Sequence, residues 1–332
     1  MESTCSTDTD NSAKLLILDN LLEEYWLSLR AANRSRKTIS RYEGSLKALA
    51  IFLKSKGLGT SINQIGAREV ASFILHLQKS RRWPNRGTAG KDFGGLSPFS
   101  IQGYVRDIKA FWSWLERQGY IGKNVMARLP LPKVPQVDMP TFSPEQVHGL
   151  LSTIDKVKPV GARYYCLLVI LLDTGLRIGE AVNIKVADLD IKGGFITVIG
   201  KGQKRRVVPF SPFTRRVLNH YIEGSKHQHI ETPSIYLFPD QSGSHISINA
   251  VQQYLRRLGK KTRLNFHRCS PHVLRHTFAT QAVVNGANLF ALKSIMGHSS
   301  LQTTAKYTHL TSSDLKTQHS TFSPAENMLK GK

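Results

Sequence analysis

The stretch that decides the fold is Thr174-Gly175-Leu176-Arg177-Ile178-Gly179-Glu180, which follows an apolar run from Tyr164 to Asp173. The run has the length and composition of a buried helix. Gly175 can end that helix, because glycine adopts the left-handed backbone of a helix C-cap without steric cost. We therefore expect Arg177 to lie in a tight turn that leads into the next helix, where its guanidinium presents a planar fork of donors suited to a phosphate.

A β-hairpin is predicted downstream of this turn. Two short runs, Phe195 to Ile199 and Arg206 to Phe210, have strand composition, and Gly200 to Arg205 separates them. Lys201 stands in the turn between two glycines. A lysine in a turn is usually a solvated charge, and Lys204 is an alternative to Lys201 for any specific role.

Two further motifs follow in the C-terminal part of the chain. His272 and Arg275 are three residues apart, so they share one face of a helix that Ser270 would cap and Pro271 would begin. Gly297-His298 comes next, and Ser299 would cap a helix that carries Tyr307. A histidine one turn before an arginine is common on protein surfaces, so this pair alone indicates little. It becomes informative because it follows Arg177 and precedes His298 and Tyr307.

That order resembles the tyrosine recombinases of the lambda-integrase type with Xer-like two-domain organisation. The resemblance is strongest from Phe142 to His309 and weaker before Pro130. It implies a mainly α fold with a small β-sheet, in which an N-terminal four-helix core-binding (SAM-like) bundle precedes a mixed α/β catalytic domain. It also implies a catalytic set consisting of Arg177, Lys201, His272, Arg275, His298 and Tyr307.

The resemblance implies a role for each residue. Tyr307 would attack a scissile DNA phosphate and form a 3′-phosphotyrosyl bond, with Thr308 and His309 as weaker candidates nearby. Lys201 would protonate the departing 5′ oxygen, and His272 would exchange a proton with the phenol.

The remaining members of the set would bind the phosphate. Arg177 and Arg275 would clamp the non-bridging oxygens, and His298 would donate a further hydrogen bond. Glu180 matches the acidic position of the family motif and would support these side chains, although a plain surface glutamate is the alternative.

Composition favours a polyanionic partner. The 332 residues include 46 Lys and Arg against 23 Asp and Glu, a formal charge of +23. Double-stranded DNA is the expected partner. A membrane partner is not expected, because no run approaches the roughly 18 apolar residues of a spanning helix. Three widely spaced cysteines and a polar N-terminus without signal-peptide order predict a reduced, cytoplasmic protein.

A proline-rich spacer divides the chain. Four prolines lie within Leu129-Pro130-Leu131-Pro132-Lys133-Val134-Pro135-Gln136-Val137-Asp138-Met139-Pro140. We predict a disordered tail at 1–12, a core DNA-binding helical domain at 13–127, the linker at 128–141, the catalytic domain at 142–322 and a flexible tail at 323–332. A surface loop within one domain is the alternative reading of the spacer. Ser143-Pro144-Glu145-Gln146 would open the second domain with a capping box.

Four helices are predicted before the spacer. They cover Leu15 to Ala31, a stripe from Ile39 to Leu53, Ala67 to Lys79, and a stripe from Ile101 to Leu115. Basic residues gather near the start of the second helix and are candidate DNA contacts: Arg34, Arg36, Lys37 and Arg41. The Arg81 to Ser97 stretch is longer than the turn of compact Xer-like members, and is either a DNA-contacting loop or an insertion.

The resemblance implies action by a homotetramer on two DNA sites, with room for accessory DNA-bending proteins. No cofactor is expected. No metal is expected either, because the pairs His272/His276 and His227/His229 lack a third ligand. The predicted function is site-specific recombination that integrates or excises a mobile element. The alternatives are Xer-type dimer resolution, a type IB topoisomerase, and a non-catalytic DNA-binding protein.

Overall fold

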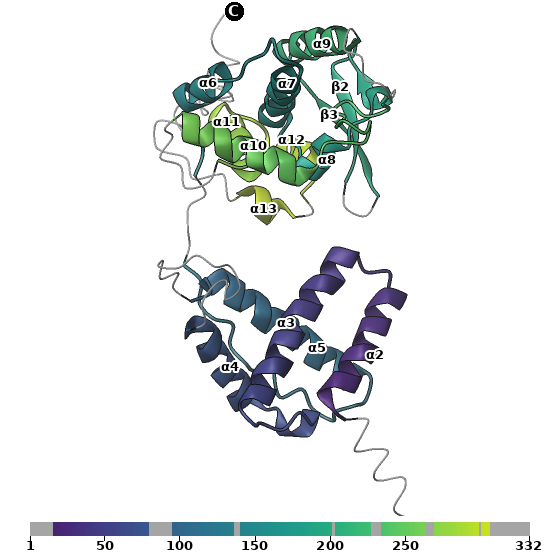
Figure 1. Cartoon of the computed structure of the whole chain (residues 1–332), viewed down its shortest axis with the longest axis vertical. Helices are drawn as coiled ribbons and strands as arrows, with labels where there is room; N and C mark the ends of the chain where they lie inside the picture. The colour runs from purple at the N-terminus through teal and green to yellow at the C-terminus, as the bar shows by residue number, and fades with distance from the viewer. Residues whose placement is uncertain are drawn as a thin grey trace, which may run out of the picture. The chain divides into compact units, whose positions relative to one another are not determined.

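The chain forms two compact units in a computed structural model, one spanning Met1–Val137 and the other Asp138–Lys332 (Figure 1). The structure describes residues 16–79, 95–135, 140–200, 203–226, 234–262, 269–298 and 300–305. The division falls within the proline-rich spacer. The predicted tails at 1–12 and 323–332 and most of the Arg81 to Ser97 stretch lie outside the described residues.

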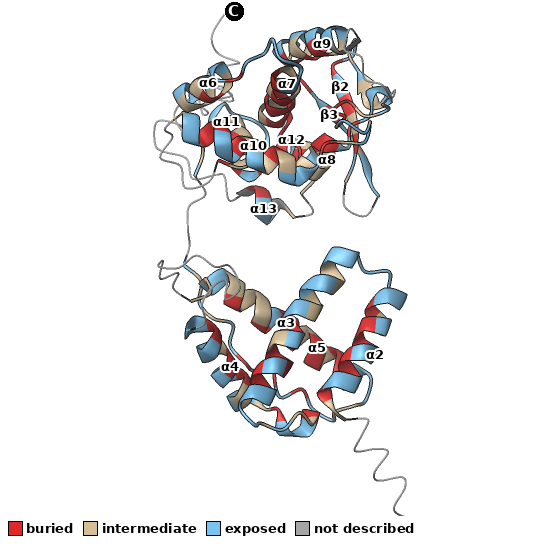
Figure 2. Ribbon diagram, viewed as in Figure 1, coloured by how far each residue is buried: buried red, intermediate tan, exposed pale blue. Residues whose placement is uncertain are grey.

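The described part of the N-terminal unit is helical, as predicted. Its helices are α2 (Leu18–Ala31), α3 (Arg36–Ser55), α4 (Ala67–Lys79) and α5 (Pro98–Arg117), with a 3₁₀ turn at Ile62–Gln64. The apolar stripe of each helix faces one core, and Phe73, Phe111 and Trp112 are among its largest fully buried side chains (Figure 2).

A buried carboxylate ties α5 to α3 inside this unit. Asp107 is 2% exposed, and one of its oxygens accepts a hydrogen bond from Ser45 Oγ at 2.7 Å. The other lies 2.8 Å from Arg41 Nη2. Arg41 itself remains 62% exposed. The ion pair therefore spans the boundary between the core and the surface.

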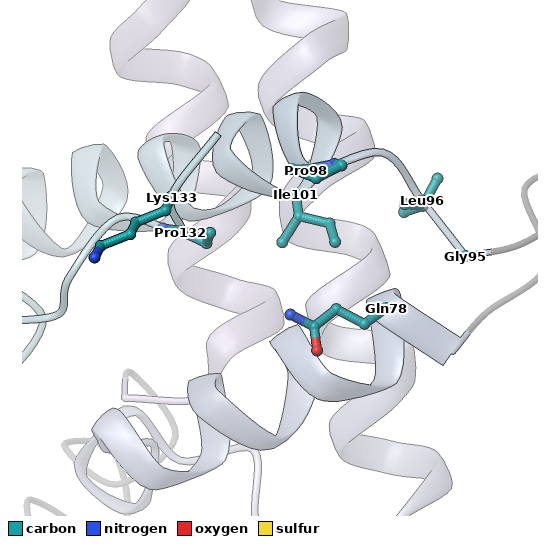
Figure 3. Close-up of a pocket in the computed structure, with 7 residues that line it drawn as sticks. All are labelled: Gln78, Gly95, Leu96, Pro98, Ile101, Pro132 and Lys133. Atoms are coloured by element: carbon teal, nitrogen blue, oxygen red, sulfur yellow. The ribbon is translucent and has the colours of Figure 1, made fainter. Parts of the chain in front are cut away.

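The N-terminal unit also holds the first residues of the spacer. Lys109 Nζ donates to Ala127 O at 2.9 Å and to Leu129 O at 2.7 Å, and Gln102 Nε2 donates to Pro132 O at 3.1 Å. A cavity of about 320 Å³ adjoins this contact (Figure 3). It is lined by Gln78 of α4, Gly95 and Leu96, Pro98 and Ile101 of α5, and Pro132 and Lys133. The spacer is thus anchored to α5 as far as Pro132.

The C-terminal unit surrounds one buried helix, α7 (Pro159–Thr174), which packs against α9 (Pro212–Lys226) and α11 (Pro271–Val284) (Figure 1). The other described elements are α6 (Pro144–Ser152), α8 (Ile178–Val182), a 3₁₀ turn (Val186–Asp188), β1 (Leu189–Asp190), β2 (Phe195–Ile199), β3 (Arg205–Pro209), α10 (Ile248–Lys261), α12 (Leu289–Met296) and α13 (Leu301–Ala305). The mainly α fold with a small sheet is confirmed.

The sheet is antiparallel in the order β1-β2-β3. The predicted hairpin is present, but its second strand begins at Arg205, one residue earlier than expected. Val198 pairs with Arg206 in the register, and Val208 on the same face as Arg206 is buried. Arg206 therefore lies on the inward face of β3.

The predicted helix boundaries around the site are mostly confirmed. Gly175 ends α7 with a φ of 60°, and a Cβ there would lie 2.2 Å from Phe278 Cδ1, so only glycine fits. Ser143 and Gln146 form the expected capping box. Pro271 begins α11 and Ser270 occupies its N-cap position, as predicted, but the Ser270 side chain makes no capping hydrogen bond. In the described segments, no helix combines the length and apolar character needed to cross a membrane.

Candidate active site

The structure places four of the six predicted catalytic residues, together with Glu180. Arg177 is the residue before α8, Arg275 lies on α11, and His298 follows the left-handed Gly297 that ends α12. His272 is exposed on the first turn of α11. Lys201 and Tyr307 lie outside the described residues. Arg177, Arg275, His298 and Glu180 come together at one place.

The meeting point is the C-terminal end of α12, where backbone carbonyls lack helical partners and carry partial negative charge. Three consecutive carbonyls, those of residues 295–297, each accept from a different arginine. Arg206 Nε donates to the first at 3.0 Å, Arg275 Nη2 to the second at 2.8 Å, and Arg177 Nη2 to the third at 2.9 Å. One helix end therefore gathers three guanidinium groups.

Glu180 is shared between two of these arginines. Its two oxygens accept from Arg206 Nη1 and Nη2, both at 2.8 Å. Arg177 Nη1 donates to the same carboxylate at 3.0 Å, and the Arg177 backbone N–H does so at 2.9 Å. Burial would raise the pKa of Glu180, but the bonds from Arg206 and Arg177 outweigh it and lower the pKa below its ordinary value. The expected supporting role thus has a geometric basis, because Glu180 holds arginine side chains.

His298 is held on both ring nitrogens. Arg275 Nη2 lies 2.9 Å from Nε2, and Thr304 Oγ1 lies 3.0 Å from Nδ1. Since arginine only donates, Nε2 accepts, and Nδ1 carries the proton and donates to the buried Thr304 hydroxyl. Burial, and then the charges of Arg275 and Arg177, lower the pKa of His298 to about 4. The ring is therefore neutral near pH 7, and in this arrangement its Nε2 is an acceptor rather than the donor that the resemblance implied.

Gly200, the residue after β2, adjoins the cluster formed by Arg177, Arg206, Arg275, Glu180 and His298. Gly200 directly precedes Lys201, and a Cβ at Gly200 would lie 3.2 Å from Arg206 Nη1 and 3.6 Å from Glu180 Oε1. The chain that leaves β2 therefore passes the arginines at a residue without a side chain.

The candidate DNA contacts of the N-terminal unit fall into two kinds. Arg34, Arg36 and Lys37 are exposed where α3 begins. Arg41 is also exposed, but it pairs with Asp107 and lies 5.0 Å from the centre of the Tyr42 ring.

Two side chains of the cluster were not predicted from the sequence, Arg206 and Thr304. Alternate side chains of a strand face the core, so an arginine on the same face as the buried residues would have been a candidate for the site. The sequence Arg205-Arg206-Val207-Val208 does not show which of its two arginines lies on that face. For Thr304 the sequence offered no signal.

The cluster is suited to bind an anion. Arg177, Arg206 and Arg275 bring three positive charges, and Glu180 compensates one of them. Charge-assisted bonds from such groups to phosphate oxygens are short and strong. In the described segments, no group of three His, Cys, Asp or Glu side chains could hold a metal ion.

Comparison with known proteins assigns the family. The model described as "Phage integrase family" matches residues 140–314, more than half of the chain. The chain belongs to the phage integrase family. As a member, it is a tyrosine-type site-specific DNA recombinase, as the sequence predicted.

Relatives of this phage integrase family member include two tyrosine recombinases. XerC of Oceanobacillus iheyensis is 30% identical over 298 residues, which cover 89% of this chain and 92% of the relative. XerD of Listeria innocua is 29% identical over 293 residues, covering 87% and 93%.

Solved structures share the fold. The XerH recombinase in a post-cleavage complex with a palindromic difH substrate superposes with a TM-score of 0.67 at 24% identity, over 90% of this chain and 83% of that one. The Tn1549 transposon integrase in complex with transposon right end DNA gives 0.69 at 23% identity, over 92% and 99%.

Proposed function

We propose that this recombinase cleaves and rejoins DNA through a 3′-phosphotyrosyl intermediate, with Tyr307 as the nucleophile. The observation that carries the proposal is the convergence of Arg177 and Arg275 on the end of α12 beside His298. The cluster has an excess of positive charge and a carboxylate that orients part of it. This is the environment that the transition state of a phosphodiester displacement needs, because negative charge builds on its non-bridging oxygens.

In the proposed reaction, the Tyr307 oxygen attacks phosphorus as the bond to the 5′ oxygen breaks. The phenol proton passes to His272, and Lys201 gives a proton to the departing 5′ oxygen. The ester energy is retained in the protein-DNA bond, so a 5′-hydroxyl can reverse the reaction without ATP. Resealing by the 5′-hydroxyl of a second duplex exchanges the strands.

Arg177 and Arg275 would clamp the phosphate. Arg177 is 40% exposed and is the more accessible of the two, whereas Arg275 is 7% exposed. A phosphate that takes the Arg275 donor now directed to His298 would release Nε2 of that ring. The imidazole could then hydrogen-bond the phosphate once Nε2 carries a proton.

We further propose that the protein grips double-stranded DNA with both units. The catalytic domain would span 142–322 and the core-binding domain 13–127, with Arg34, Arg36, Lys37 and Arg41 on the DNA backbone. The formal charge of +23 supports this partner. The solved XerH and Tn1549 integrase structures are DNA complexes, which also supports it. Assembly as a homotetramer on two sites, accessory DNA-bending proteins, and action in the cytoplasm belong to the same proposal.

The proposed biological role is integration and excision of a mobile element. The test uses DNA from either side of the gene, nicked near the cleavage position so that the covalent intermediate is trapped. A protein-DNA adduct that survives SDS is expected for the wild type. The adduct should be absent in Tyr307→Phe and retained in Tyr165→Phe, a matched change on α7. Binding without an adduct would favour a non-catalytic DNA-binding protein and overturn the proposal.

A second assay separates the enzymatic alternatives. Two cognate sites on one supercoiled plasmid should give exchanged products if the protein is a recombinase. Relaxation of the plasmid without exchange would identify a type IB topoisomerase. Recombination restricted to a chromosomal dimer site, with none between the element ends, would identify Xer-type resolution.

A further inference from the structure

Arg206 lies against both described acceptors of the Arg177 side chain. The Arg177 side chain has two described acceptors, Glu180 Oε1 at 3.0 Å and Gly297 O at 2.9 Å. Arg206 binds the first acceptor group through both carboxylate oxygens. It also packs on Gly297, where a Cβ would lie 2.9 Å from Arg206 Cζ. Its Nε further donates to the neighbouring Ile295 carbonyl at 3.0 Å.

The Arg206 side chain lies deeper than that of Arg177. It is 15% exposed, against 40% for Arg177, and its donors point at Glu180 and at the end of α12. All three nitrogens of its guanidinium donate to Glu180 or to the end of α12, so Arg206 is placed to hold these groups.

The charge arrangement gives this contact a chemical consequence. Glu180 is 7% exposed, so its attraction to a guanidinium is only weakly screened by water. While Arg206 binds both oxygens, the Arg177 side chain binds only Oε1. Without Arg206, the carboxylate could draw Arg177 into a two-point ion pair, because guanidinium and carboxylate match in that geometry. The donors of Arg177 would then turn from the phosphate to Glu180.

We propose that Arg206 is a positioning residue for DNA cleavage: it fixes both acceptors of Arg177 and holds Glu180, so that Arg177 stays available to the scissile phosphate. The inference rests on the proposed phosphotyrosyl reaction and adds a residue that the predicted catalytic set lacks.

The test measures single-turnover adduct formation on the nicked DNA at saturating protein, so that differences in DNA affinity do not enter. Arg206→Gln is expected to slow cleavage by roughly 10- to 100-fold, the scale of a small misplacement of a reacting group. Arg205→Gln is the matched control on the same strand; Arg205 is exposed, and its variant should cleave at the wild-type rate. Equal rates for Arg206→Gln and the wild type would overturn the inference.

A double variant separates positioning from a general structural role. In Glu180→Gln/Arg206→Gln the carboxylate that would capture Arg177 is gone, so this protein should cleave faster than Arg206→Gln alone. A merely structural role predicts the opposite, because two cluster contacts are lost instead of one. A double variant as slow as the single variant, or slower, would contradict the proposal. If Arg206→Gln does not fold, Arg206→Lys takes its place in both comparisons, since it keeps the charge and loses the two-point contact.

A modified substrate gives an independent readout. Replacing one non-bridging oxygen of the scissile phosphate by methyl removes the charge that Arg177 meets. The ratio of wild-type to Arg206→Gln rates should therefore fall on the methylphosphonate DNA, and an unchanged ratio would count against action through Arg177. Wild-type protein that forms no adduct on ordinary DNA would refute the proposed function instead, so the two failures are distinguishable.

Discussion

The two units of the chain bury a carboxylate against arginine in different ways. In the N-terminal unit, Asp107 is 2% exposed and pairs with Arg41, with Ser45 as its second partner. In the C-terminal unit, Glu180 is 7% exposed and is shared by Arg177 and Arg206. Each oxygen of both carboxylates has a hydrogen-bond or ion-pair partner, as a buried charge requires.

The difference lies in the balance of charge. The first pair is neutral, so it can tie two helices together without needing a ligand. In the second, Arg275 adds a third guanidinium and the positive charges exceed the negative one. The carbonyls at the end of α12 take up part of this excess. The balanced pair of Asp107 and Arg41 stabilises the fold without a ligand. The unbalanced cluster of Arg177, Arg206, Arg275 and Glu180 has an excess of positive charge and is suited to bind an anion.

The largest effect is expected in the unbalanced cluster. Arg275→Gln should slow adduct formation by roughly 100- to 1,000-fold, the usual cost of losing one donor to a developing oxyanion. The measurement is the single-turnover rate on nicked DNA. Asp107→Asn, a change in the balanced pair, is the control and should leave that rate unaltered once the protein is folded. Arg275→Gln cleaving as fast as the wild type would remove Arg275 from the phosphate site.

The next largest effect is expected on the stability of the N-terminal unit, which the balanced pair supports. Asp107→Ala should lower the free energy of unfolding by about 1–3 kcal/mol, because the buried Ser45 hydroxyl loses its acceptor. Arg41 contributes less to this loss, since water can replace its partner. All four tryptophans precede residue 118, so fluorescence in urea reports on the N-terminal unit.

The control for that change is Asp19→Ala, which breaks the exposed pair between Asp19 and Lys54. Its cost should be at most about 1 kcal/mol. Equal losses for the two variants would show that burial of Asp107 does not matter.

A smaller effect is expected on the pH dependence of stability, through His298. The pKa of His298 is lowered from 6.5 to about 4, so between these values the unfolded chain binds a proton that the folded chain does not. The contribution of His298 to stability is therefore present above pH 6.5 and declines as the pH falls toward 4. Urea midpoints followed by circular dichroism should differ most between wild type and His298→Gln near neutral pH. A difference that grows on acidification would reverse the sign and refute the neutral ring.

The smallest effect is expected for Arg41. Because Asp107 already compensates its charge, Arg41→Gln should weaken DNA binding less than Arg34→Gln, whose charge is exposed and has no carboxylate partner among the described contacts. Arg34→Gln should also reduce the slope of log affinity against log salt by about one if Arg34 meets a phosphate. Gel shifts at several salt concentrations measure both. Equal losses of affinity would indicate that Arg41 leaves Asp107 on binding DNA.

Much of the fold could be predicted from local sequence patterns. The apolar run that Gly175 ends, the capping box at Ser143 and Gln146, and the stripes of the N-terminal helices are each set by residues within a few positions of one another. Such patterns follow from backbone geometry and helix periodicity, which the sequence displays directly.

The site was harder to predict because its contacts span long separations. Arg206 lies 26 residues from Glu180 and 89 from Ile295, and nothing local distinguishes it from the adjacent Arg205. Arg177, Arg275 and His298 were found through the family resemblance, not through their packing. The buried Asp107 was missed because it lies within an apolar helix face, where its partners Arg41 and Ser45 come from another helix.

The use of backbone carbonyls at the end of α12 has a consequence for how sequence change can damage the enzyme. Every residue type supplies a carbonyl, so no side-chain replacement at Ile295 or Met296 deletes an acceptor. A one-residue insertion or deletion within α12 would instead turn its end by roughly 100° and displace all three acceptors together. The contacts between the arginines and α12 should therefore survive changes of residue type along this helix, but not a change in the number of its residues.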